Sequence, residues 1–281
     1  MLMDVHTHIF PPQIIADRQA YFAGEPTFQA LYQSPKARMI GAEDLIRAMD
    51  EARIDVSVTF GFPWTDTELA ARHNDYVLAT AARYPARIVA LACVYPLSRG
   101  AAAEADRCLR AGARGLGELA IYGQVDEAEA LHHFEPLIAC LSEPRRPLLV
   151  HANEPVGHVY PGKAPLKLSF YYELARKCAG IPLILAHWGG GLCFYELLKK
   201  EAGEVLANVT YDTAASPYLY KSSIYARMVA AIGQEKILFG SDYPLLAPAR
   251  YFKEMEQCGL SAEAMGALCG ANSARLFGLI P

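Results

Sequence analysis

The stretch Leu2-Met3-Asp4-Val5-His6-Thr7-His8 shows the pattern on which the fold depends: a short apolar run that ends in polar side chains. Pro147-Leu148-Leu149-Val150-His151 and Leu183-Ile184-Leu185-Ala186-His187 have the same form. Strands that are buried on both faces have continuous apolar runs, which is typical of a parallel sheet covered by helices. We therefore expect these three segments to be parallel strands.

The alternation of apolar runs with amphipathic stretches continues along the chain, and no linker or low-complexity segment divides it. This pattern predicts an α/β fold, a single (β/α)8 TIM barrel that forms one domain over residues 1–281. A doubly wound open sheet is the alternative. An insertion at residues 10–40 follows the first strand, and extra helices end the chain. The expected strands are 2–8, 55–60, 88–95, 113–118, 147–151, 183–187, 205–212 and 237–241; the expected helices are one opening at Gly41 and those at 66–84, 101–111, 126–141, 168–178, 194–202 and 220–232.

Composition limits the partners. Of the 281 residues, 53% are hydrophobic and 20% are charged, and 26 Lys and Arg against 30 Asp and Glu give a net charge of −4. Such a chain has enough apolar side chains for a core, and neither charge forms a long block. We expect a small-molecule substrate rather than nucleic acid or membrane. No secretory signal precedes the first strand, so a cytoplasmic location is expected; a homo-oligomer is left open.

The cysteines form no CxxC pair and are odd in number, so neither a zinc ribbon nor a disulfide framework is predicted. Most lie within apolar patterns, which favours buried free thiols. The seven are Cys93, Cys108, Cys140, Cys178, Cys193, Cys258 and Cys269.

Six potential metal ligands fall at the carboxyl ends of the expected strands, where the active sites of such barrels form. Residues two apart on a strand point to the same face, so two imidazoles from one strand can meet one ion. Histidine and carboxylate ligands without thiolate suit Zn²⁺, Mn²⁺, Fe²⁺, Co²⁺ or Ni²⁺ and are typical of catalytic sites. The alternative for the first pair is a solvated strand end. The six are His6, His8, Glu118, His151, His187 and Asp242.

Four of these segments resemble the metal motifs of the amidohydrolase superfamily, most closely its amidohydrolase-2 branch. They are Met3-Asp4-Val5-His6-Thr7-His8-Ile9-Phe10-Pro11, Leu149-Val150-His151, Leu185-Ala186-His187-Trp188-Gly189-Gly190 and Phe239-Gly240-Ser241-Asp242-Tyr243-Pro244. That branch contains hydrolases and the zinc-dependent decarboxylases related to aminocarboxymuconate semialdehyde decarboxylase. The PHP phosphoesterases, which also open with Asp-x-His-x-His, fit the later motifs poorly.

The resemblance implies that His6, His8, His151 and Asp242 bind a divalent metal, most simply Zn²⁺. It also implies that His187 orients the water of that metal or binds a second ion. A metal lowers the pKa of bound water from 15.7 towards about 7, and Asp242 would accept and pass on its proton. Locally, Asp242 could instead be a turn or helix-capping residue, which does not explain its three histidine partners.

Glu118 departs from the decarboxylase-like pattern. Two-metal hydrolases of the superfamily use a carboxylate or a carbamylated lysine at the end of the fourth strand as a bridge. One divalent ion with two carboxylates is neutral, whereas two ions keep positive charge and can hold a hydroxide. The alternative, weighted equally, is that Glu118 pairs with a cation such as Arg114 or Lys163.

Residues of the strand-end loops are expected to contact the substrate. Lys163 and Tyr160 could hold a carboxylate, and Trp64 and Trp188 could wall a ring; Asn153 and Tyr243 lie in the same loops. His158 is interpreted as a substrate-side residue. His73, His132 and His133 fall in helical patterns and are expected on the surface.

The function predicted first is a metal-dependent hydrolase acting on an amide or lactone carbonyl, with a metal-activated hydroxide and Asp242 as proton shuttle. The alternative is a metal-dependent decarboxylase acting on a small carboxylic acid. A second alternative is a barrel that binds metal or ligand without turnover. Glu118 favours the hydrolase, and the general form of the motifs favours the decarboxylase.

Overall fold

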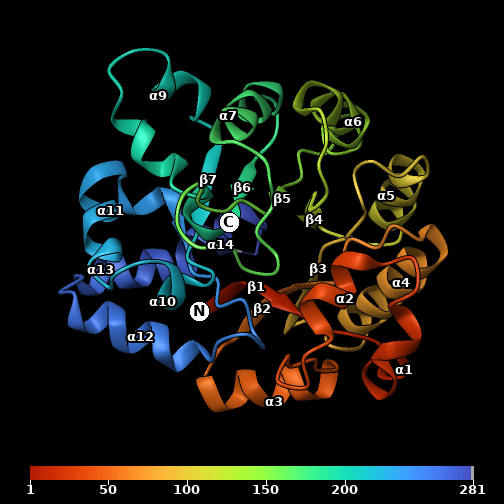
Figure 1. The fold of residues 1–281 in the computed structure, drawn as a ribbon. Helices are drawn as coiled ribbons and strands as arrows, with labels where there is room; N and C mark the ends of the chain where they lie inside the picture. Colours follow the sequence, from red (N-terminus) through yellow and green to blue (C-terminus); the bar gives the residue numbers. More distant parts are fainter. Residues whose placement is uncertain (280–281) are drawn as a thin grey trace.

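The eight strands lie in the middle of the molecule, and helices surround them (Figure 1). The structure is a computed structural model and describes residues 1–279, so the expected domain of residues 1–281 reaches two residues outside the described range. All eight expected strands are present, most of them shorter than predicted. They are β1 (Met3–His8), β2 (Val56–Phe60), β3 (Ile88–Ala90), β4 (Leu116–Leu119), β5 (Leu148–Val150), β6 (Leu183–Leu185), β7 (Val209–Asp212) and β8 (Ile237–Leu238).

The strands pair in parallel as two sheets, β1-β2-β3 and β4-β5-β6-β7-β8. The expected single closed sheet is therefore not observed. At the two seams the strands are short, and pairing is reduced to the isolated bridges Thr7 with Tyr243 and Ala92 with Leu116. Backbone hydrogen bonds still cross each seam, from Val5 N to Phe239 O (2.9 Å) and from Ala92 N to Gly115 O (3.1 Å). The α/β class and the parallel strand order agree with the prediction.

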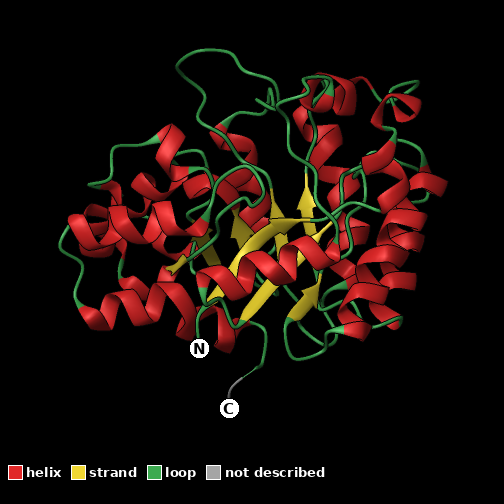
Figure 2. Ribbon diagram, turned by 90° about the horizontal axis from the view of Figure 1, so that it is seen from below, coloured by secondary structure: helices red, strands yellow, loops and turns green. Residues whose placement is uncertain are grey.

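All strands point the same way, so their carboxyl ends meet on one side of the molecule (Figure 2). The N-terminus lies on the opposite side. Inside the strands, Val5, Val58, Leu149, Ile184 and Leu238 form one buried cluster that joins both sheets. This cluster fills the interior beneath the carboxyl ends and supports whatever side chains project there.

The helices follow the expected alternation, with short additional elements in the loops. The insertion after β1 contains three short helices rather than extended chain, and a π-helical turn lies near the end of the chain. The elements are α1 (Pro12–Ala16), η1 (Arg18–Tyr21), α2 (Pro26–Tyr32), α3 (Ala42–Ala52), α4 (Thr67–Arg83), α5 (Ala101–Arg110), α6 (Glu127–Cys140), α7 (Leu168–Lys177), α8 (Ala186–Gly189), η2 (Leu192–Leu197), α9 (Ala202–Val205), α10 (Ser216–Leu219), α11 (Ile224–Ile232), η3 (Gln234–Lys236), α12 (Pro248–Gln257), α13 (Ala262–Gly266), η4 (Ala267–Ala271) and α14 (Asn272–Leu276).

Several expected boundaries differ from those of the structure. The helix predicted at 194–202 is the 3-10 helix η2 followed by irregular chain, and the strand predicted at 205–212 begins only at Val209, because Val205 ends α9. Apolar runs alone do not separate a short helix from a strand, which explains the second error. His187 does not extend β6 but lies beyond it, in a left-handed conformation with φ 56°.

All seven cysteines are free thiols, and five of them are buried, as expected. Cys140 and Cys258 are half-buried. None of the helices in the described range 1–279 is both long and apolar enough to cross a membrane.

Candidate metal centre

The six predicted ligands come together at the carboxyl ends of the strands. His6 and His8 project from β1 and Glu118 from β4. His151 directly follows β5, whereas His187 and Asp242 lie two and four residues beyond the ends of β6 and β8. Their ligand atoms form three overlapping groups, each with all atoms within 4.8 Å of one another. The fold therefore brings together residues that are up to 236 positions apart in the sequence, from His6 to Asp242, and the strand-end rule identified them.

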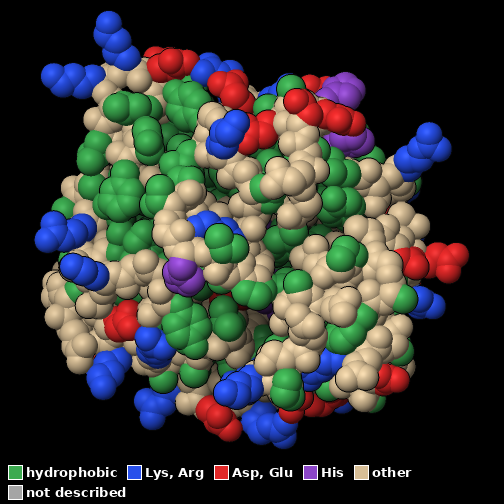
Figure 3. Space-filling view, in the orientation of Figure 1, with side chains coloured by type: hydrophobic (Ala, Val, Ile, Leu, Met, Phe, Trp, Pro, Cys, Tyr) green, Lys and Arg blue, Asp and Glu red, His purple; other side chains and the backbone are tan. Residues whose placement is uncertain are grey.

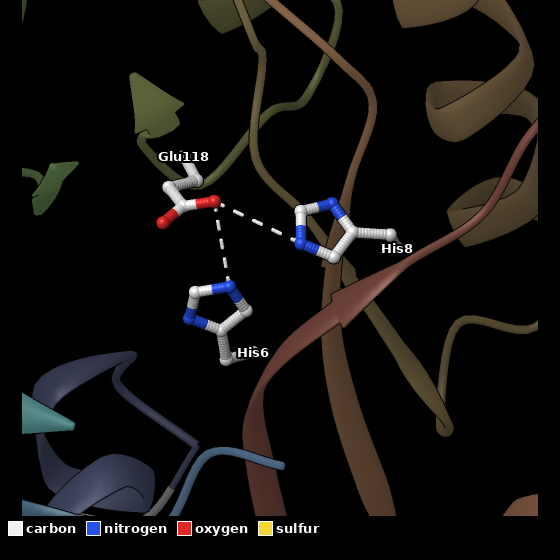
Figure 4. A group of neighbouring side chains, drawn as sticks. All are labelled: His6, His8 and Glu118. Carbon is white, nitrogen blue, oxygen red and sulfur yellow. Dashed lines mark ion pairs between the residues drawn. The ribbon is translucent and has the colours of Figure 1, made fainter. Parts of the chain in front are cut away.

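One group surrounds the oxygen Oε2 of Glu118. It lies 3.5 Å from His6 Nε2 and 3.7 Å from His8 Nε2, as Figure 4 shows. Oδ1 of Asp242 lies 3.7 Å from His6 Nε2 and 3.3 Å from His8 Nε2. Asp242 also forms a group with His6 and His187, so its carboxylate links this part of the centre to His187.

These separations fit a shared ion better than hydrogen bonds. A metal with ligand bonds of about 2.1 Å holds neighbouring ligand atoms roughly 3.0–3.4 Å apart, close to the separations observed. Direct hydrogen bonds between nitrogen and oxygen are shorter, about 2.7–3.2 Å. Moreover, His6 Nε2 is buried and has no hydrogen-bond partner within residues 1–279. A buried unpaired nitrogen is costly, and a metal bond would satisfy it.

A second group surrounds the other oxygen of Glu118. Oε1 lies 2.9 Å from His151 Nδ1 and 3.5 Å from His187 Nε2. The 2.9 Å separation is that of a direct hydrogen bond, and His151 Nε2 also lies 3.1 Å from the carbonyl oxygen of Gly162, so both nitrogens of His151 are hydrogen-bonded in this structure. Each oxygen of Glu118 faces two histidines. Neither Arg114 nor Lys163 pairs with Glu118, so the alternative of a simple ion pair with one of these cations is wrong.

Hydrogen bonds on the far side of two rings orient their free nitrogens. His6 Nδ1 lies 2.8 Å from Asp212 Oδ2, and His187 Nδ1 lies 3.0 Å from the carbonyl oxygen of Ala214. Both partners are acceptors, so each Nδ1 carries a proton and each Nε2 faces the centre, where it would bind a metal once it is deprotonated. This is the usual arrangement of metal-binding histidines.

Without a metal, the charges of the centre shift each other's protonation. Burial lowers the pKa of His187, but the Glu118 carboxylate outweighs burial and raises it to about 9. Burial raises the pKa of Asp242, but the hydrogen bond to His8 and the charge of His6 lower it to about 2. Glu118 is likewise held well below its usual pKa by His6 and His151, in spite of burial. The two carboxylates are thus ionised at neutral pH and attract cations.

Left-handed backbone conformations concentrate around the centre. His187, Trp188 and Asp242 have φ of 56°, 61° and 59°. Non-glycine residues in this region carry strain, which persists where surrounding contacts impose it. The Asp242 amide donates to the His6 carbonyl oxygen (2.9 Å), and the preceding residue, Ser241, donates through N and Oγ to the buried Asp4 carboxylate (3.0 and 2.5 Å). These bonds fix the turn that carries Asp242 against β1.

A cavity of about 520 Å³ opens above the centre. His8, Glu118, His151, His187 and Asp242 line its base. Its walls are mainly aliphatic and aromatic, and Arg38 is the only Lys or Arg among the described residues that line it; the other wall residues include Tyr32, Phe62, Tyr122, Tyr160, Tyr218 and Leu245. Figure 3 shows the molecule from this side, where hydrophobic side chains cover much of the face. The cavity suits a small, largely apolar molecule with an anionic group.

Comparison with known proteins identifies the family of the chain. A family model described as Amidohydrolase matches residues 3–279. The chain belongs to the amidohydrolase family. A search of curated proteins finds no match.

The fold of this amidohydrolase is also found in solved structures. It resembles 5-carboxyvanillate decarboxylase from Sphingomonas paucimobilis (16% identity, 99% of this chain and 98% of that chain covered, TM-score 0.76). It also resembles dihydroxybenzoic acid decarboxylase from Polaromonas sp. JS666, a structure with bound manganese and 2-nitroresorcinol (17% identity, 99% of this chain and 97% of that chain covered, TM-score 0.69). A third similar structure is that of a protein from Pseudomonas putida proposed to be a 2-pyrone-4,6-dicarboxylic acid hydrolase (17% identity, 100% of this chain and 98% of that chain covered, TM-score 0.70). At these identities the likeness shows the fold.

The structure places three expected substrate residues of the amidohydrolase away from the cavity wall. Trp64 and Trp188 are fully buried, with Nε1 of Trp64 donating to His73 Nδ1 (2.9 Å) and Nε1 of Trp188 donating to Ser216 Oγ (2.7 Å). Asn153 is also buried, and its side chain binds the backbone of Ala164. These three side chains are buried and hydrogen-bonded within the protein, so their positions do not allow direct contact with a substrate in the cavity.

In the loop after β5, two of the predicted substrate residues line the cavity and one does not. Tyr160 and His158 line the cavity. Lys163 does not, because Nζ binds Glu154 Oε1 (3.3 Å) and the carbonyl oxygens of Val156 and His158 (2.8 and 3.2 Å). Within residues 1–279, Arg38 is the one Lys or Arg of the wall, and it lies in the insertion, where no motif marked it. Tyr243 lies directly below it, with the two side chains 3.5 Å apart.

His73 is not a surface residue as predicted. It is buried in α4, accepts the Trp64 indole proton and donates from Nε2 to Ile9 O (2.7 Å). Burial lowers its pKa to about 4, so the ring is neutral. His132 is exposed, as expected, and His133 is half-buried. His73 thus anchors the chain just after β1 without touching the cavity.

Asp212 is the main residue that sequence reasoning missed. It is the last residue of β7, is fully buried and contacts His6. The rule that found the other ligands, a polar residue at a strand end, applies equally to this position. The aromatic wall residues Tyr32 and Tyr122 lie outside any strand-end motif, and only the three-dimensional structure identifies them.

Proposed function

We propose that this amidohydrolase is a metal-dependent hydrolase acting on the amide or lactone carbonyl of a small molecule. The observation that carries the proposal is the position of Glu118, whose two oxygens each face a separate pair of histidines. A carboxylate so placed can be shared by two divalent ions, which in two-metal enzymes lie about 3.5–4 Å apart. We propose Zn²⁺ as the metal, with His6, His8 and Asp242 on one side and His151 and His187 on the other.

Bound divalent metal would supply a nucleophile at neutral pH and polarise the carbonyl of the substrate. The chain supplies the proton transfers. Burial raises the pKa of Asp242, but the hydrogen bond to His8 and the charge of His6 lower it, so Asp242 lines the cavity as a carboxylate in the metal-free protein. In the reaction it would accept a proton from the attacking water and return it to the leaving group. Most side chains of the cavity wall are aromatic or aliphatic, so a substrate that fills the cavity would displace water from the centre.

The side chains of the cavity wall also favour one class of substrate. Tyr32, Phe62 and Tyr122 would pack against a ring, and the Arg38 guanidinium would pair with a carboxylate at the far end of the molecule. We therefore propose a cyclic or ring-bearing substrate with one acidic group. We also propose that the protein acts in the cytoplasm as one barrel domain and needs neither nucleic acid nor membrane, in keeping with the evenly distributed net charge of −4.

The experiment is a panel of lactones, amides and aromatic or enoic acids, each incubated in ¹⁸O-labelled water with metal-loaded protein. We expect ¹⁸O in one product of a lactone or amide. In the same assay Glu118→Gln should bind fewer ions and lose at least about 100-fold in rate, whereas Glu129→Gln, at an exposed position of α6, should match the wild type. Release of carbon dioxide from an acid, without label in the product, would overturn the hydrolase.

Decarboxylation is the second candidate, and the resemblance in fold to two decarboxylases favours it. The same panel decides between the two reactions. A third reading, binding without turnover, would hold if Asp242→Asn retained its metal and left every activity in the panel unchanged. The number of ions follows from metal analysis of the saturated protein: two per chain support the shared role of Glu118, and one contradicts it.

A further inference from the structure

Asp212 connects the two halves of the centre although it does not line the cavity. Its side chain is fully buried at the end of β7 and accepts hydrogen bonds on both oxygens. Oδ2 accepts from His6 Nδ1 (2.8 Å), and Oδ1 accepts from the backbone N of His187 (2.9 Å) and of Ala214 (3.0 Å). Both oxygens of this buried carboxylate are engaged in hydrogen bonds, so Asp212 constrains the residues that donate to it.

The first constraint acts on His6. Because Asp212 can only accept, the His6 ring keeps its proton on Nδ1 and presents Nε2 to Glu118 Oε2 and Asp242 Oδ1. The ring has no freedom to turn, since it also packs edge-on against Phe60, with ring centroids 5.1 Å apart. Asp212 therefore fixes the protonated nitrogen of one ligand on the Oε2 side of Glu118.

The second constraint acts on His187 through the backbone. His187 has a left-handed conformation (φ 56°), and its amide is held by Asp212 Oδ1. The same oxygen holds the amide of Ala214, whose carbonyl accepts from His187 Nδ1 at 3.0 Å. One carboxylate oxygen thus positions both the backbone of His187 and the acceptor that orients its ring, with Nε2 towards Glu118 Oε1 (3.5 Å).

We infer that Asp212 is a positioning residue that sets the orientation of one histidine on each side of Glu118, so that the two halves of the metal centre form together. The inference rests on the metal centre proposed above, but not on the reaction carried out there. Its consequence is that a single substitution at Asp212 weakens metal binding on both sides, including at His187, whose ring Asp212 does not contact.

The test uses Asp212→Asn, which keeps the shape but replaces an acceptor by a donor towards His6. Thr213→Val is the matched control: Thr213 is equally buried in the same loop and bonds Gly240, but contacts neither imidazole. Metal affinity is measured by Zn²⁺ competition with a chelator, and the state of each ring by ¹⁵N and proton NMR of histidine-labelled, zinc-loaded protein.

We expect Asp212→Asn to lose about 10- to 100-fold in Zn²⁺ affinity, with the Nδ1–H resonances of both His6 and His187 displaced. Thr213→Val should keep the affinity and both resonances. Wild-type affinity in Asp212→Asn, displacement of His6 alone, or an equal loss in Thr213→Val would overturn the inference. If Asp212→Asn does not fold, Asp212→Glu is measured against Thr213→Val by the same criteria. Failure of the wild-type protein to bind Zn²⁺ would overturn the metal centre itself, which is a distinguishable result.

Discussion

Protons and metal compete for the same nitrogens, so metal affinity should fall steeply with pH. In the metal-free protein the pKa of His187 is about 9, because the Glu118 carboxylate outweighs burial. Below pH 9 an ion must displace this proton before it can bind Nε2. The apparent affinity for metal is therefore highest above pH 9 and falls about tenfold for each pH unit below it.

The size of the effect follows from the same pKa. For one displaced proton with a pKa of about 9, the apparent affinity falls about 500-fold between pH 9 and pH 6. His6 increases the loss: burial lowers its pKa, but the charges of Glu118 and Asp212 raise it well above the usual value. The fall should therefore be at least 500-fold.

The assay is Zn²⁺ competition with a chelator of known pH dependence, from pH 6 to pH 9. Calorimetry in two buffers with different ionisation enthalpies counts the protons released at pH 7, and we expect one or more for each saturated centre. His132→Asn, at an exposed position on α6, is the control and should follow the wild-type curve. An affinity that changes less than tenfold over this range, or binding without proton release, would refute the reasoning.

Two further predictions concern the cavity and the loops that support it. Arg38→Met should raise the KM of an acidic substrate about 10- to 100-fold, since a hydrogen bond to a charged group contributes about 1.5–3 kcal/mol, and should leave the KM of the uncharged analogue unchanged. Arg47→Met, outside the cavity, is the control and should change neither KM. Gly190→Ala should lower the free energy of unfolding by at least about 2 kcal/mol in chemical denaturation, because Gly190 has φ 62° and a Cβ there would collide with the Asn153 carbonyl oxygen. An unchanged unfolding midpoint would contradict this, and Gly203→Ala, where no atom lies near, is its control.

The strands and the ligands were predictable because both follow from short-range patterns. Parallel strands buried on both faces are apolar, and the residue that follows such a run at its carboxyl end lies at the centre of the sheet. His151 and Asp242 satisfy this rule, and so does Asp212, which was overlooked because it was treated only as the end of a strand. Pairing at the seams was not predictable, since it depends on how far β3 and β8 extend, which the apolar run does not determine.

The substrate wall was harder to predict because a loop position does not determine burial. Trp64 and Trp188 follow strand ends as the ligands do, yet each is drawn into the interior by its apolar surface and a single indole hydrogen bond. His73 shows the same limit in a helix: amphipathic spacing suggested the surface, but its two hydrogen-bond partners are remote in sequence. Arg38 was missed because only the folding of the insertion brings it to the cavity.

The seams between the two sheets give the metal centre a second effect. His6 belongs to one sheet and Glu118 to the other, and only a few backbone bonds cross each seam, among them Val5 N to Phe239 O and Gly117 N to Ala92 O. An ion held by both residues would resist any opening that separates the sheets, since binding to the native state stabilises it. The amides of Val5 and Gly117 should then exchange their hydrogens with solvent slowly in the metal-loaded protein and much faster after chelation. The site that performs the chemistry would also determine how often the sheets come apart.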